Sequence, residues 1–140
     1  MRTDLFRACE AHTLETLLQG IDHGIEAHLA WNQHLLRCAL LHEAPGDDVF
    51  RPDAHTNCLF GVWLASHRYE LEPFAAALVD RIAEAHRRMH DAVRSMCHRV
   101  MHGRPAIAAD LQAYEQGQSS MVTLLNELRE SVAEAATHQD

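Results

Sequence analysis

The chain has 140 residues, of which 47% are hydrophobic and only 6% aromatic, and its formal net charge is −8. This negative charge argues against electrostatic binding to nucleic acid or to an anionic membrane. No apolar run approaches the roughly 18 residues of a membrane span, and no apolar signal segment follows Met1, so we expect a cytoplasmic protein. The length predicts a single domain over residues 1–140.

The first long helix is predicted from an N-cap at Thr13 to about residues 41–42. Its apolar residues recur at spacings of three and four, which is the helical pattern. His28 falls on this apolar stripe, where an unpaired polar ring is disfavoured. Two glycines inside the helix, Gly20 and Gly24, indicate that another backbone packs closely against it.

A short helix is predicted to hold the next apolar stretch, Cys58–Leu64. Asp53 or Thr56 could cap this helix, because side-chain oxygens at such positions accept hydrogen bonds from free amide groups. Gly61 within it predicts close packing against a neighbouring element. Residues 69–73 are interpreted as a connection to the following helix.

A third helix is predicted over residues 74–100, where apolar residues alternate steps of four and three. Turn residues at 103–105 end it. A fourth helix is predicted over residues 107–135, with Gln118 as the one polar residue on its apolar seam. Together these patterns predict an all-α protein, an antiparallel four-helix bundle with an additional short helix that carries Cys58.

Twelve histidines and four cysteines are the unusual features of the composition. The spacing of His86 and His90 puts two imidazoles on one helix face, about 6 Å apart along the axis, where they can hold one metal ion. Cys58 lies near a helix start, where free amide groups favour its thiolate. Taken singly, each of these residues, and His28, is equally well explained as a core or surface side chain. Their combination indicates a metal site.

The remaining cysteines and histidines are interpreted as structural or surface residues. Disulfides are not expected, because cytosolic thiols are kept reduced. His55 lies three residues before Cys58 and is the best spare ligand, but we leave it outside the predicted site. Trp31 follows His28 by one turn and could cover the metal.

Three segments resemble, in order and in spacing, the CZB family of chemoreceptor zinc-binding domains. They are Ile25-Glu26-Ala27-His28-Leu29-Ala30-Trp31, Cys58-Leu59-Phe60-Gly61-Val62-Trp63 and Ala85-His86-Arg87-Arg88-Met89-His90. The likeness covers a core at about residues 14–128 and includes residues 114–117. Family members are attached to bacterial chemoreceptors and to a zinc-regulated diguanylate cyclase, whose N-terminal domain looks like the nearest relative.

The resemblance implies a Zn²⁺ site made by His28, Cys58, His86 and His90, in a bundle that forms a homodimer. Three imidazoles and one thiolate suit tetrahedral zinc, and a closed shell leaves no position for an activated water. We therefore expect a sensor and not an enzyme, with zinc occupancy and, by resemblance, oxidation of Cys58 as its signals. Its output would be cyclic-di-GMP synthesis or chemotaxis.

No cyclase signature and no chemoreceptor signalling hairpin occurs in the 140 residues, so an attached output domain or a partner protein would have to read the sensor's state. Three other functions stay open at this point. One is a haemerythrin-like iron bundle, which needs bridging carboxylates at helical spacing, such as an HxxxE motif with a downstream HxxxxD, and no HxxxE occurs in the sequence. The others are a stand-alone zinc buffer and a helical interaction module whose histidines bind nothing.

Overall fold

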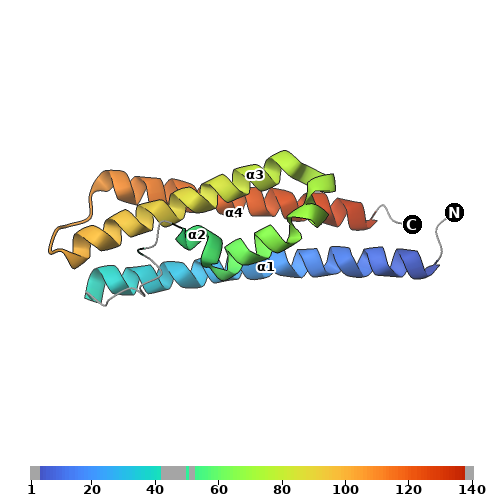
Figure 1. Ribbon diagram of the computed structural model, residues 1–140, viewed down its shortest axis with the longest axis horizontal. Coiled ribbons are helices and arrows are strands. Elements are labelled where there is room, and N and C mark those ends of the chain that lie inside the picture. The colour runs from blue at the N-terminus through green and yellow to red at the C-terminus, as the bar shows by residue number, and fades with distance from the viewer. Residues whose placement is uncertain (1–3, 42–49, 51–52, 138–140) are drawn as a thin grey trace.

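The structure, a computed structural model, describes residues 4–41, 50 and 53–137 of the chain (Figure 1). Its helices are α1 (Asp4–Leu41), α2 (Ala54–Asn57), α3 (Leu59–Met101) and α4 (Ala108–Thr137). The described ranges contain no strand, which confirms the predicted all-α fold. In the same ranges, no helix combines the length and the apolar character needed to cross a membrane.

Helix α3 is bent. Ala75 has non-helical backbone angles (φ −167°, ψ 64°), and Pro73 lies just before it inside the helix. Proline has no backbone N–H to give to the helical ladder, and its ring crowds the preceding turn, so a kink here is expected. The predicted connection at residues 69–73 is therefore wrong in detail: the helix continues through these residues and breaks at Ala75. We call residues 59–74 the first arm of α3 and residues 76–101 its second arm.

Because α3 bends at the kink, its two arms and the other long helices form the predicted antiparallel bundle. In Figure 1, α1 and the second arm run in one direction, whereas the first arm and α4 run in the other. Each long segment is thus antiparallel to the one that precedes it in the chain. The described end of α1 at Leu41 agrees with the prediction, but the helix begins at Asp4, well before the predicted cap at Thr13.

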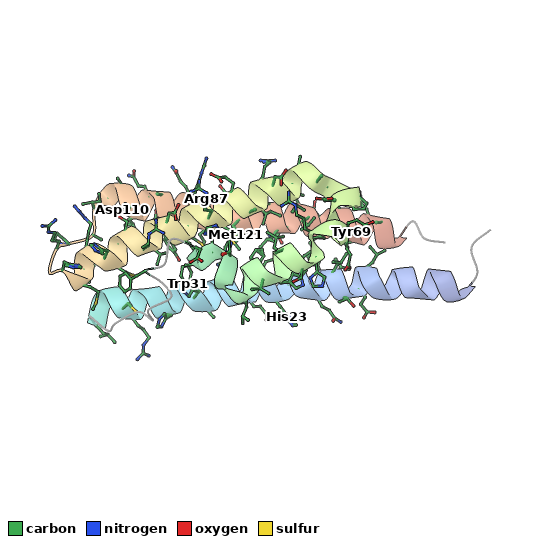
Figure 2. All side chains as sticks on the ribbon, viewed as in Figure 1. His23, Trp31, Tyr69, Arg87, Asp110 and Met121 are labelled. Carbon is green, nitrogen blue, oxygen red and sulfur yellow. The ribbon has the colours of Figure 1, made fainter. Side chains whose placement is uncertain are left out.

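The main core lies between the second arm and α4, where the steps of four and three place one apolar seam against another. Its fully buried side chains include Val79, Ile82, Met89, Val93, Met121, Leu125, Leu128 and Val132. Figure 2 shows Arg87 on the outer side of the second arm, where it pairs with Glu84 and Asp91. Gln118 is the one polar residue on the apolar seam of α4. Its side-chain oxygen accepts a hydrogen bond from the Tyr114 hydroxyl at 3.1 Å.

Helix α1 packs against the first arm through its two glycines. A Cβ at Gly20 would collide with the indole of Trp63, and a Cβ at Gly24 would press on the ring of Phe60. The prediction of a close approach is confirmed, but aromatic side chains and not another backbone make it. This contact brings the start of α3 against the middle of α1.

Candidate metal centre

Three separate segments contribute the predicted ligands. His28 comes from the middle of α1, Cys58 from the junction of α2 and α3, and His86 and His90 from successive turns of the second arm. The three histidines are only 5%, 2% and 8% exposed, respectively. His86 and His90, predicted to lie beside the apolar stripe, are thus inside the core. Buried histidines need bonding partners, because an unpaired polar ring is costly in an apolar interior.

Cys58, His86 and His90 form a group that could hold a metal ion. Their ligand atoms all lie within 4.8 Å of one another. The Cys58 Sγ is 3.2 Å from His86 Nε2, and His86 Nε2 is 3.0 Å from His90 Nε2. Neighbouring donors on a tetrahedral zinc ion lie about 3.3–3.6 Å apart, given bond lengths of about 2.0–2.3 Å. The three donors are therefore already close to the separations that a shared ion requires.

His28 lies beside this group but is not one of its mutually close donors. Its ring centroid is 5.1 Å from that of His86 and 6.5 Å from that of His90. The Nδ1 atom of His28 is buried and has no hydrogen-bond partner among the described residues. A buried nitrogen without a partner points to a ligand that occupies it. The role of His28 as the fourth metal ligand stays a prediction.

Burial keeps the imidazoles of His28 and His86 neutral. It lowers the pKa of His28 to about 4, with a further contribution from His90. It lowers the pKa of His86 to about 2, with smaller contributions from the neighbouring histidines. Neutral rings have a free nitrogen lone pair at neutral pH, which is the form that binds a metal.

Cys58 lies between two helices and caps the second. Helix α2 ends at Asn57, so the predicted short helix is wrong in detail, since Cys58 precedes α3 instead of lying within a short helix. The predicted side-chain cap by Asp53 is also absent, although Asp53 occupies the N-cap position of α2. The Gly61 N–H donates to Cys58 Sγ at 3.3 Å, as expected at a helix start.

The amide groups around Cys58 do not decide its protonation. Burial raises the pKa of the Cys58 thiol, and the backbone donors at Gly61 and Phe60 lower it by less. Without a metal the sulfur is thus a thiol at neutral pH. Metal binding at this residue has to release its proton, which couples metal affinity to pH.

Aromatic rings enclose the site. Trp31 lies over His90 with ring centroids 4.7 Å apart, and Phe60 meets His86 edge-on at 5.0 Å. Trp31 lies on α1 near the α2–α3 junction in Figure 2, and its ring contacts those of His28 and His90. A cavity of about 180 Å³ adjoins the group. Its lining is Ala27, His28, Trp31, Ala54, Cys58, Leu59, Phe60 and His90.

Gly61 is required by the fold of this junction. A Cβ at position 61 would occupy the space of the backbone carbonyl oxygen of His55, because α2 folds back onto the first turn of α3. We expect Gly61→Ala to lower the free energy of unfolding by about 3 kcal/mol and to weaken metal binding, because it displaces Cys58. Chemical denaturation checks this. The exposed neighbour is the control: Val62→Ala should change the stability by less than about 0.5 kcal/mol, and equal effects would contradict the assignment.

His55 is the residue that sequence reasoning left out and the structure brings to the site. Its Nδ1 is buried and has no hydrogen-bond partner among the described residues. Its ring centroid is 6.5 Å from that of His86. The spacing of three residues before Cys58 was the only sequence signal for it.

Cys38 and Cys97, interpreted from the sequence as structural, are both buried. Burial raises the pKa of Cys97 to about 11, which makes its thiol unreactive. The side chain of Cys9 lies outside the described residues.

No protein-family model, no curated protein and no solved structure matches this chain.

Proposed function

We propose that this chain is a zinc-binding regulatory domain, in which His28 completes a closed shell with Cys58, His86 and His90. The group of one sulfur donor and two buried nitrogen donors carries the proposal. Nitrogen and sulfur donors favour zinc over hard cations such as Mg²⁺ and Ca²⁺, which prefer oxygen. The Nδ1 of His28, which has no hydrogen-bond partner among the described residues, supports a fourth bond from α1.

A closed shell is suited to regulation. Four protein ligands leave no coordination position for a substrate or an activated water. A metal held in this way would join α1, the α2–α3 junction and the second arm, which are otherwise separate parts of the bundle. Metal occupancy would then change how these segments pack, and an attached domain or a partner could respond to that change.

The likeness of the three ligand segments to the CZB family adds to the proposal a cellular location, an oligomeric state and a signalling output. By this likeness, the domain acts in the cytoplasm as a homodimer. It reports zinc, or oxidation of Cys58, to a diguanylate cyclase or a chemoreceptor. These parts rest on the motifs around His28, Cys58 and His86–His90 alone.

The experiment is a zinc titration of metal-free protein, kept reduced, with metal content measured on the washed complex. We expect one tightly bound zinc ion per chain, with protons released as Cys58 ionises. The absence of stoichiometric binding would overturn the proposal.

The chain offers a matched control for the titration. His98 and His102 have the same spacing as His86 and His90 but lie exposed at the end of α3. Replacing His86 and His90 by alanine should abolish tight binding, whereas the same change at His98 and His102 should leave it intact. If both pairs of substitutions had the same effect, binding would be a property of exposed histidine pairs and not of the buried group.

The donor set also favours zinc over the haemerythrin-like alternative. A di-iron centre needs carboxylates that bridge two metal ions. The buried group instead consists of Cys58, His86 and His90. An iron-dependent optical band in the purified protein would favour the iron centre over zinc.

A further inference from the structure

His55 has an unexplained nitrogen atom next to the metal centre. The ring belongs to α2 and is half-buried, and its Nδ1 has neither solvent nor a hydrogen-bond partner among the described residues. Burying a ring nitrogen without a partner is unfavourable. Of the described side chains, only His28, His55 and Arg99 have such an atom, and the first is already a predicted ligand.

The position of His55 places this nitrogen within reach of the group. Two imidazoles that share a tetrahedral zinc ion have ring centroids about 5 Å apart, given the Zn–N bond length. The centroids of His55 and His86 are 6.5 Å apart, the same separation as those of His28 and His90. A shift of about 1–2 Å, by the same bond-length argument, would bring His55 into the shell.

His55 and Cys58 cannot move independently. The Cys58 Sγ donates to the backbone carbonyl of His55 at 3.8 Å, and the Cys58 N–H donates to Ala54 O at 3.1 Å. The same carbonyl of His55 lies against Gly61. A small rotation of α2 about this contact would therefore change the positions of both side chains relative to His86 and His90.

We propose that His55 is an alternative ligand of this metal centre, which takes the place of Cys58 when that sulfur is not bound to the metal. The centre would then have two ligand sets, one with sulfur and one with four imidazoles. This inference rests on the proposed zinc site and adds a second coordination state to it.

A double-mutant cycle tests the exchange, with Zn²⁺ for affinity and Co²⁺ as the optical probe. In the wild-type protein, His55→Ala should change the dissociation constant by less than about threefold. In the Cys58→Ala background, His55→Ala should raise it by about 30-fold, which corresponds to about 2 kcal/mol. His23→Ala is the matched control, because His23 is exposed on α1, and it should have no effect in either background.

The cobalt spectra report the ligands directly. Wild-type protein should show a sulfur-to-cobalt charge-transfer band. Cys58→Ala should lose that band but keep the intense visible bands of tetrahedral cobalt, and adding His55→Ala should remove these as well. Cys58→Ser with His55→Gln is a second pair that preserves the hydrogen bond from Gly61, and circular dichroism verifies the fold of each variant.

Two outcomes are distinguishable. If the wild-type protein bound neither metal, the proposed function would fail and this inference with it. If the wild-type protein bound cobalt through sulfur but His55→Ala had the same effect in both backgrounds, only the role of His55 would be overturned.

Discussion

Replacing Cys58 by alanine is expected to raise the dissociation constant for zinc by about 100-fold, whereas Cys97→Ala should change it by less than about threefold. The structural reason is the position of each sulfur. Cys58 Sγ is 3.2 Å from His86 Nε2 and belongs to the group of ligand atoms. Cys97 lies on the same second arm as His86, two turns beyond His90, so it has the same side chain as Cys58 but lies outside the group of ligand atoms.

Competition with a chelating dye of known affinity measures both constants. The stability of each metal-free variant should be measured alongside, because any buried cysteine contributes to packing whether or not it binds metal. Equal losses of affinity for the two substitutions would contradict the assignment of Cys58 as a ligand. If Cys58→Ala left no detectable zinc binding, no other residue would be taking the place of Cys58 as a ligand.

Removing zinc with a strong chelator is expected to lower the melting temperature by about 15 °C. A ligand present at about 1,000 times its dissociation constant stabilises the folded state by about 4 kcal/mol, and about 1 kcal/mol corresponds to about 4 °C in a domain of this size. The metal would join α1 to the second arm, so its loss should also weaken the attachment of α1.

Differential scanning calorimetry with and without chelator gives this shift. The variant in which His86 and His90 are both alanine is the control, since its melting temperature should not respond to the chelator. An unchanged melting temperature in the wild-type protein would favour the helical interaction module whose histidines bind nothing.

Periodicity predicted the regular parts of the fold well. The steps of four and three along residues 74–100 and 107–135 recur because every seventh residue returns to nearly the same face of a helix. They correspond to the second arm and α4, whose seams form the buried core. His28 was also placed correctly, because a polar residue on an apolar stripe is buried with that stripe.

The junction around Cys58 could not be predicted in the same way. The break between α2 and α3 brings the backbone carbonyl of His55 against Gly61, a contact between two helices that residue spacing does not predict. Pro73 was interpreted as the end of a connection, whereas the helix continues through it and kinks at Ala75. The place of His55 follows from that junction, so spacing alone could not reveal it.

The two arms of α3 meet at the bend at Ala75, so a small change of angle there becomes a larger displacement at the far end of the first arm. Cys58 lies at the far end of the first arm, about 16 residues or roughly 24 Å from the bend, whereas His86 and His90 lie on the second arm. A bond from a metal to both arms would set the angle between them. If that bond opened, a rotation of only about 10° at Ala75 would move the tip of the first arm by roughly 4 Å, given this length. Phe60 and Trp63 near that tip lie on Gly24 and Gly20, so the displacement would pass directly to α1.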